Sequence, residues 1–284
     1  MTINVLKLGG GAGVDQAAGL QNLAERIQSG EQWVLVHGAS DAANRLAEQV
    51  GYPAQTLVTP GGHTSRYTDA RTIEIFCAAA GSVNQQVTAQ LSALGVNAVG
   101  LAGPNIIQAR RKTAIRAIRN GRQIIVRDDF TGTIIGINAP LLLTLIEAGI
   151  TPVTAPIAMG EAFERLNVDG DLVAANIARE LNADTLIILS NVPGLLRDVS
   201  DRASLIPQFS LVELATYEGL AEGRMKKKLL AGQQANAARV ILADSRVAAP
   251  IDTALAGGGT HILRGQTEAM WRAQAMAQEV VYAD

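Results

Sequence analysis

Two glycine-rich turns are the first features of this sequence that could do chemistry. Residues 7–11 read KLGGG, between an apolar run and a segment of helical period. Glycines at such a turn let backbone N–H groups approach an anion, and Lys7 adds a full positive charge. The spacing is neither a P-loop nor a dinucleotide-binding fingerprint, and such turns are common. The HGAS turn at residues 37–40 repeats the arrangement after the next apolar run, which favours a phosphate site.

Charged groups also gather at two predicted helix starts. Residues 167–171 read NVDGD and precede a helix that runs to about Leu181. Asp171 would cap or start this helix, or one of the two carboxylates would orient cations around a nucleotide or touch a metal. Residues 223–228 read GRMKKK, and these four cations oppose the dipole of the helix that they begin. A bound anion would explain this placement, although Lys226 and Lys227 would also suit a solvated face.

The segment from Gln108 to Arg127 is strongly basic and contains no acidic residue. Its Asn120-Gly121 pair, between Ile118 and Ile124, predicts a β-hairpin turn. The whole chain carries −2, so the seven positive charges here leave −9 for the rest. An exposed hairpin face is one interpretation, and an acidic macromolecular partner is the other. The seven cations are Arg110, Arg111, Lys112, Arg116, Arg119, Arg122 and Arg127.

Apolar runs rich in Val and Ile alternate with segments of helical period, which is typical of βα units around a mainly parallel sheet. A helix is predicted at 15–29 with Asp15 as its N-cap, and another from Asn138 to Gly149. Ser210 and Glu213 have the spacing of a capping box. The tail after Gly265 also has a helical pattern. The predicted strands are Ile3–Leu8, Trp33–His37, Asn97–Leu101, Thr151–Thr154, Leu186–Ser190 and Val240–Ala243.

Composition excludes several classes of function. The 284 residues are 48% apolar, enough for one large core or two lobes. A net charge of −2 argues against a nucleic-acid-binding protein. Cys77 is the single cysteine, so neither a disulfide nor a cysteine metal cluster is expected. The N-terminus does not resemble a signal peptide, and the apolar region 139–158 contains Glu147 and three prolines. We therefore expect a cytoplasmic protein without a membrane span.

Taken in order, these motifs resemble the amino-acid kinase family. The resemblance runs from residue 3 to about residue 263, and RYTD at 66–69, RRKT at 110–113, FTGT at 130–133 and GRMK at 223–226 narrow it. Those phrases are similar to the N-acetylglutamate kinase branch, and especially to its LysW-aminoadipate kinases. The resemblance implies an α/β fold, a three-layer αβα sandwich with an open, mainly parallel central sheet. It also implies an N-terminal acceptor-binding lobe at 1–165 and a C-terminal nucleotide-binding lobe at 166–284.

The resemblance further implies a role for each matching residue. Lys7 and Lys228 would flank the transferred phosphoryl group, with Asp171 holding them in register. Ala39 departs from the glycine that is usual in the family, so its contact is less certain than that of Gly38. His37 is interpreted as a structural histidine bonded to the backbone. The remaining matches are phosphate-binding Gly9, Gly10, Gly38 and Ala39, acceptor-binding Arg66 and Asn167, and nucleotide-binding Ser190, Asn191, Gly194 and Leu195.

The implied reaction is phosphoryl transfer from ATP, with Mg²⁺ held mainly by the nucleotide, to a carboxylate. LysW, as the resemblance implies, is a small acidic carrier whose C-terminal glutamate bears the substrate. Arg110, Arg111 and Lys112 are the expected carrier contacts, because arginines favour carboxylate-rich partners. Carrier-bound aminoadipate in lysine biosynthesis is the first hypothesis. The alternatives are free N-acetylglutamate or carrier-bound glutamate in arginine biosynthesis, and a non-catalytic ATP-binding regulator. A homodimer is also implied.

Overall fold

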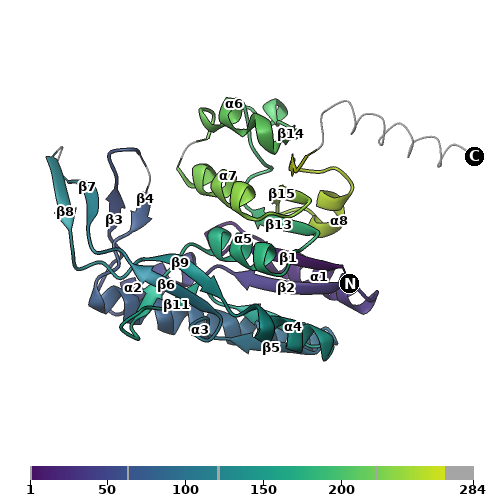
Figure 1. Cartoon of the computed structure of the whole chain (residues 1–284), viewed down its shortest axis with the longest axis horizontal. Helices are drawn as coiled ribbons and strands as arrows, with labels where there is room; N and C mark the ends of the chain where they lie inside the picture. The colour runs from purple at the N-terminus through teal and green to yellow at the C-terminus, as the bar shows by residue number, and fades with distance from the viewer. Residues whose placement is uncertain (1, 63, 120–121, 222, 266–284) are drawn as a thin grey trace, which may run out of the picture.

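The computed structural model describes residues 2–62, 64–119, 122–221 and 223–265, and its centre is an eight-stranded sheet (Figure 1). The strand order is β14-β16-β15-β13-β1-β2-β10-β5. Every neighbouring pair is parallel except β15 with β16. The strands are β1 (Ile3–Leu8), β2 (Gln32–His37), β5 (Ala98–Leu101), β10 (Thr151–Thr154), β13 (Thr185–Ser190), β14 (Gln208–Ser210), β15 (Arg239–Asp244) and β16 (Thr260–Leu263).

Helices cover both faces of this sheet, because its strands are apolar on both sides. One core cluster joins alternate strand residues to α4, α5, α6 and α7, and the other joins the opposite residues to α1, α2, α3 and α8. The predicted three-layer αβα architecture is therefore confirmed. The helices are α1 (Gln16–Gln28), α2 (Ser40–Gln49), α3 (Ala70–Ala93), α4 (Ala139–Glu147), α5 (Gly170–Glu180), α6 (Leu214–Glu218), α7 (Arg224–Gln234) and α8 (Pro250–Leu255), with short 3₁₀ turns at Arg202–Ser204 and Leu211–Glu213.

The order of the central sheet separates the two halves of the chain. Strands β1, β2, β10 and β5 come from residues before 165, and β13, β15, β16 and β14 come from residues after it. The halves meet where β1 pairs with β13. This arrangement agrees with the lobes at 1–165 and 166–284, but the boundary and the roles of the two lobes stay predictions.

Two smaller four-stranded sheets lie on the N-terminal half. One has the order β12-β11-β6-β9, with β6 (Ile107–Arg111), β9 (Gly132–Ile137), β11 (Ile157–Met159) and β12 (Arg165–Asn167). The other has the order β4-β3-β7-β8 and projects from one end of the molecule (Figure 1). Its strands are β3 (Thr56–Val58), β4 (Thr64–Arg66), β7 (Ile115–Arg119) and β8 (Arg122–Val126).

The basic segment of the sequence is divided between these two sheets. The predicted hairpin is present, since β7 and β8 pair antiparallel up to the Arg119 and Arg122 backbones. The turn residues 120–121 lie outside the described residues. The hairpin, however, covers only 115–126 of the predicted 108–127, because Arg110 and Arg111 belong to β6 in the other sheet. The seven cations therefore do not share one hairpin face.

Local sequence signals place most helix starts correctly. Asp15 caps α1 by accepting from the Ala18 N–H, and Asn138 caps α4 by accepting from the Leu141 N–H. The Glu213 carboxylate accepts from the Ser210 N–H as a capping box requires, but the box opens a short 3₁₀ turn before α6. The tail pattern falls on residues 266–284, outside the described part. Among the described residues no helix is long and apolar enough to cross a membrane.

Candidate active site

Fourteen of the sixteen predicted site residues line one cleft of about 1290 Å³. Its walls include the loops that follow β1, β2 and β13 and the first turns of α2, α5 and α7. The strands β13, β1 and β2 are neighbours in the central sheet, so their carboxyl ends lie side by side, as expected for a site in an open α/β sheet. The cleft is lined by Lys7, Gly9, Gly10, Gly38, Ala39, Arg66, Lys112, Asn167, Asp171, Ser190, Asn191, Gly194, Leu195 and Lys228; Arg110 and Arg111 are not among its lining residues.

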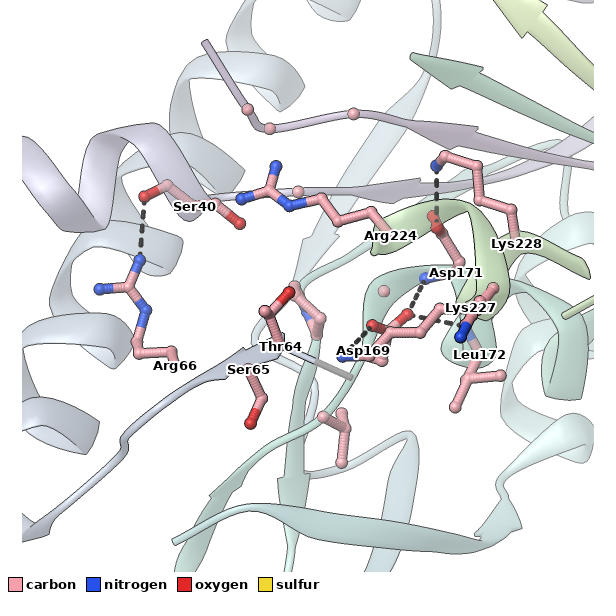
Figure 2. A pocket seen from close by; sticks show the side chains of 18 of the residues that line it. Ser40, Thr64, Ser65, Arg66, Asp169, Asp171, Leu172, Arg224, Lys227 and Lys228 are labelled. Atoms are coloured by element: carbon pink, nitrogen blue, oxygen red, sulfur yellow. Dashed lines mark hydrogen bonds and ion pairs between the residues drawn. The ribbon is translucent and has the colours of Figure 1, made fainter. Parts of the chain in front are cut away.

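A buried cluster of three charged groups lines the cleft. The Lys7 ammonium lies 2.7 Å from one carboxylate oxygen of Asp171. The Lys228 ammonium lies 2.9 Å from the other oxygen (Figure 2). Lys7 shares its strand face with Ile3 and Val5, which pack on the same side of the sheet as α5 and α7. Because strand side chains alternate, β1 directs Lys7 toward the two helices that carry its partners. Tertiary structure thus joins residues 221 positions apart in sequence.

Burial and ion pairing set the charges of this cluster. Burial would raise the pKa of Asp171, but the Lys228 and Lys7 ammonium groups outweigh it and hold that pKa well below its usual range. Burial lowers the pKa of Lys228, an effect that Asp171 opposes and the charge of Lys7 reinforces. Asp171 therefore stays ionised and holds two cations side by side, facing the cleft.

At the start of α5, one of the two alternatives for Asp171 is confirmed, because this residue lies in the first turn of the helix but does not cap it. Asp169, not Asp171, is the N-cap, since its carboxylate accepts from the N–H groups of Asp171 and Leu172. Asp169 also pairs with Lys227 at 3.1 Å. Asp171 lies within the first turn of the helix, so its side chain is free of capping and binds the two lysines. Capping by Asp169 is the physical reason that the second carboxylate of the motif can serve the site.

The two glycine-rich turns touch each other through their backbones. A Cβ atom on Gly10 would lie 2.0 Å from the Gly38 carbonyl carbon, and one on Gly38 would lie 2.4 Å from the Gly10 nitrogen. Such distances exclude any side chain at either position. The Gly10 carbonyl also accepts from the Asp41 N–H at 2.7 Å, which ties the first turn to the beginning of α2. The glycines thus bring two strand ends close enough to form one anion-binding surface.

The phosphate-binding prediction needs a correction at two of these glycines. The Gly38 N–H donates to the Leu8 carbonyl at 2.8 Å, and the Gly9 N–H donates to the Leu189 carbonyl at 3.0 Å. These two N–H groups are not available to a ligand, because the backbone hydrogen bonds of the sheet continue for one residue beyond the ends of β1 and β2. Among the described residues no partner is recorded for the N–H groups of Gly10, Gly11 and Ala39. Gly10 and Ala39 therefore remain candidate donors, and Gly11 joins them.

Ala39 is accommodated without strain. Its φ of −136° is open to any residue, and its methyl group is buried in the core beneath α2. It is the N-cap of α2 but makes no side-chain cap; Ala39 and Ser40 line the cleft, whereas the Asp41 N–H of the first turn donates to the Gly10 carbonyl. The expected penalty for replacing glycine at this position does not arise.

Replacing Gly10 with alanine should damage the site and the fold together. The added methyl group would overlap the Gly38 backbone, and backbone cannot move aside as a side chain can. We expect Gly10→Ala to lose about 1–3 kcal/mol in free energy of unfolding, as overpacking typically costs, and most of its activity. Gly11→Ala is the matched control, because its methyl group would meet only the flexible end of Arg224. Urea denaturation compares the two; equal stability would contradict the backbone contact.

His37 is a structural residue, as predicted. Its Nδ1 lies 3.4 Å from the Gly38 carbonyl, and its Nε2 lies 3.1 Å from the Asn84 amide nitrogen. With the proton on Nδ1, the ring donates to the carbonyl and accepts from the amide. Burial, reinforced by the charge of Lys7 and opposed by the Gly38 carbonyl, lowers the pKa of His37 to about 4. The ring is therefore neutral at physiological pH.

This buried imidazole should make the protein sensitive to acid. In the unfolded chain a histidine has a pKa of about 6.5, so the unfolded state takes up a proton first as the pH falls. The resulting loss, about 3 kcal/mol at most, should develop between pH 6.5 and 4. His37→Gln retains an acceptor for Asn84 but does not titrate, so its stability should fall less over that range. Chemical denaturation at several pH values measures the difference, and parallel curves would contradict the prediction.

Arg66 and Asn167 both line the cleft, and their role in binding the acceptor stays a prediction. The Arg66 guanidinium donates to the Ser40 carbonyl at 3.1 Å and also to the Asn44 side chain (Figure 2). Burial lowers the pKa of Arg66, and the charge of Arg224 lowers it further. The Asn167 amide donates to the Thr68 hydroxyl at 3.1 Å. Both side chains are positioned by neutral partners, which leaves the charge of Arg66 available to a ligand.

The four residues predicted to contact the nucleotide line another part of the cleft, but two of them are also tied to the fold. Asn191 donates to the Ala12 carbonyl at 3.1 Å, which links the loop after β13 to the loop after β1. The Leu195 N–H donates to the Thr260 hydroxyl at 2.8 Å, and its side chain is buried. A Cβ on Gly194 would lie 2.5 Å from that hydroxyl. Ser190 ends strand β13.

The three predicted carrier contacts have different surroundings. Arg110 is exposed and pairs with Glu161 at 3.2 Å. Arg111 lies 3.6 Å over the Phe130 ring and donates to the Asp129 carbonyl, so it packs against the fold. Lys112 lines the cleft, where burial and the charge of Lys227 lower its pKa. One segment therefore contributes a surface cation, a packed cation and a cleft cation.

Sequence reasoning gave no individual role to several residues that line the cleft, including Gly11, Arg224 and Lys227, although each belongs to a motif that it singled out. Arg224 and Lys227 belong to the predicted GRMKKK motif, but the motif alone does not show which cations face inward. Helical spacing places Arg224, Lys227 and Lys228 on one face of α7, three and four positions apart. Lys226 lines the cleft as well, so spacing alone does not identify all the lining cations.

Comparisons with known proteins identify the family. The amino acid kinase family model matches residues 2–241. A LysW-aminoadipate kinase from Deinococcus radiodurans is 44% identical, over 91% of this chain and 90% of that protein. One from Thermus thermophilus is 40% identical, over 91% and 99%. The solved N-acetylglutamate synthase from Neisseria gonorrhoeae shares the fold, at 21% identity and a TM-score of 0.76 over 94% of this chain and 60% of that one. This chain therefore belongs to the amino acid kinase family.

Proposed function

We propose that this protein transfers the γ-phosphoryl group of ATP to the side-chain carboxylate of aminoadipate while the carrier LysW holds the substrate by its amino group. The observation that carries the proposal is the identity of 44% and 40%, over 91% of the chain, to relatives named LysW-aminoadipate kinase. The product is an acyl phosphate, and its place is lysine biosynthesis.

The chemistry needs positioned cations more than a base. The carboxylate, with a pKa of about 4.3, is ionised at neutral pH. One of its oxygens forms the new bond to the γ-phosphorus, while the bond from that phosphorus to the bridging oxygen breaks and its electron pair leaves with ADP. Lys7 and Lys228 would neutralise charge on the phosphoryl oxygens, with their spacing fixed by Asp171. Gly10, Gly11 and Ala39 would donate N–H groups to the same oxygens.

The residues present suit ATP with its metal. Open N–H groups and several cations face the cleft, and Ser190, Asn191, Gly194 and Leu195 line the part proposed for the nucleotide. Among the described residues no group of three or more His, Cys, Asp or Glu could hold a metal ion. We therefore assign Mg²⁺ mainly to the phosphates of the nucleotide. When bound there, it neutralises charge on the phosphate oxygens.

The acceptor would lie on the other side of the two lysines. Arg66 would bind the α-carboxylate of aminoadipate, and Asn167 would lie beside it. Lys112 would attract the acidic carrier at the cleft, and Arg110 would do so at the surface, while Arg111 would support this region by packing on Phe130. We also propose a homodimer, in line with the family resemblance.

An acyl-phosphate assay with hydroxylamine trapping tests this function. The acceptors are LysW-bound aminoadipate and free N-acetylglutamate at matched concentrations, with ATP saturating. We expect a kcat/KM at least about tenfold higher for the carrier-bound acceptor, since one additional charged contact is worth that much. Equal efficiency with the free acceptor would reject carrier-bound aminoadipate. The absence of ATP turnover with every acceptor would favour a non-catalytic regulator.

Carrier-bound glutamate is the second candidate acceptor. A relative from Pyrobaculum calidifontis is 38% identical over 81% of this chain and 88% of that protein. Its name gives it both activities, as a LysW-aminoadipate and LysW-glutamate kinase. The two acceptors differ by one methylene group, which an apolar pocket distinguishes by only about 1–3 kcal/mol. The same assay with LysW-bound glutamate separates them. A higher kcat/KM for LysW-bound glutamate than for LysW-bound aminoadipate would assign the enzyme to arginine biosynthesis instead.

A further inference from the structure

Arg224 extends across the cleft from the nucleotide half of the molecule. It is the first residue of α7, the helix that carries Lys228. Figure 2 shows its side chain pointing away from Lys228 and toward Ser40, the residue whose carbonyl accepts from Arg66. A methyl group on Gly11 would lie 3.1 Å from an Arg224 terminal nitrogen. Arg224 thus begins on α7 and ends between the turn after β1 and Ser40, on the side of the cleft where Arg66 is bound.

Arg224 and Arg66 are two cations that lie close enough in the cleft to affect each other's charge. The charge of Arg224 contributes to lowering the pKa of Arg66, after burial. Within the described part of the chain, no ion pair is recorded for either guanidinium. The nearby acids are engaged elsewhere, Asp171 with Lys7 and Lys228, and Asp169 with Lys227. The two guanidinium groups are therefore available to bind anions of a ligand.

A carrier-linked acceptor has two carboxylates besides the one that is phosphorylated, one for each of Arg66 and Arg224. The carboxylate that receives phosphate belongs beside Lys7 and Lys228, and the α-carboxylate of aminoadipate satisfies Arg66. A free acceptor has no further carboxylate. An acceptor joined through its amino group to a C-terminal glutamate brings one more, because that glutamate has two carboxyl groups and the link uses only one. Arginine binds a carboxylate through two parallel hydrogen bonds, so it suits this additional anion.

We propose that Arg224 binds the free carboxylate of the carrier's terminal glutamate and so makes the enzyme selective for carrier-linked acceptors. This inference rests on the proposed function. It assigns selectivity to a residue inside the cleft, independent of the basic residues on the surface. It also explains why the positive charge at the start of α7 opposes the helix dipole, since the carboxylate would lie close to both.

A paired change of enzyme and substrate tests the assignment. LysW bearing aminoadipate is made by semisynthesis in two forms, with the remaining carboxylate of its terminal glutamate either free or converted to the primary amide. The wild type should favour the free acid by about 10- to 100-fold in kcat/KM, the usual effect of one charge-assisted contact. In Arg224→Gln the two forms should differ by no more than about twofold. Lys226→Gln, a cleft-lining change on the same helix, should keep the wild-type preference.

Three results would overturn the proposal. The first is a wild type that does not distinguish acid from amide, and the second is an Arg224→Gln variant that keeps the full preference. The third is an equal loss with both forms together with a raised KM for ATP, which would place Arg224 on the phosphates. The proposed function fails separately, when the wild type does not phosphorylate the free-acid form at all. Circular dichroism of each variant checks that it is folded.

Discussion

The Lys7→Ala variant is expected to fold and to lose about 10²- to 10³-fold or more in kcat, the usual cost of removing one donor from a water-excluded site. Folding should survive because Asp171 keeps Lys228 as a partner at 2.9 Å. Catalysis should be largely lost, because in the proposed mechanism one side of the transferred phosphoryl group loses its cation. Lys228→Ala should show a loss of the same order, since the two ammonium groups share one carboxylate. The acyl-phosphate assay at saturating substrates measures both.

Two further variants make this experiment decisive. Lys7→Arg keeps the charge but replaces a compact ammonium by a planar fork, so its kcat should stay well below that of the wild type. Lys226→Ala removes a cation that lines the same cleft and should retain near-normal turnover, because no contact with Asp171 depends on it. A folded Lys7→Ala variant with near-normal turnover would contradict the catalytic role.

Asp171→Ala should cost about 3–5 kcal/mol in free energy of unfolding as well as abolish most activity. The change leaves two ammonium groups buried together without a counter-ion, and breaking a buried pair in this way is strongly destabilising. Burial opposes ionisation of Asp171, but both lysines favour it, and its pKa is held low. Its stabilising effect is therefore complete above the pKa of an unfolded aspartate, about 3.9, and is lost as the pH falls further.

The control for Asp171→Ala replaces the whole cluster. A triple variant, Lys7→Met with Asp171→Leu and Lys228→Met, removes the buried charges and fills the space with apolar side chains. It should recover most of the lost stability, because replacing a buried ion pair by packed apolar groups is often neutral. It should stay inactive. Urea denaturation at pH 7 measures stability, and an Asp171→Ala variant as stable as the wild type would contradict the buried cluster.

The local sequence was sufficient to predict most elements of the central sheet. The six predicted strands are present as β1, β2, β5, β10, β13 and β15, because runs of apolar residues buried on both faces suit only parallel strands under helices. The hairpin of β7 and β8 was also predicted from its turn residues, but β14, β16 and the other short strands of the two smaller sheets were not. These strands are three to six residues long and depend on pairing with distant segments.

The parts of the site that were predicted are, like the strands of the central sheet, those that depend on local sequence. Glycines after β1 and β2, and the charged motifs at 167–171 and 223–228, are local features that the sequence displays directly. Which N–H groups face the cleft is not local. Gly9 and Gly38 donate to neighbouring strands, and this depends on the register of β1 with β13 and β2. The cap of α5 depends on the turn geometry before it, so Asp169 and Asp171 could not be told apart.

From the sequence alone it follows that Lys7 lies near the end of a buried strand, that four cations begin α7, and that glycines separate two strand ends from their helices. Folding in three dimensions was needed to show that Lys7 and Lys228 share Asp171, that Arg111 packs on Phe130, and that Arg224 lies near Arg66 in the cleft. The physical reason is the order of the sheet. Periodicity fixes the face on which a side chain lies, whereas the neighbours of β1 are set by packing between residues far apart in the chain.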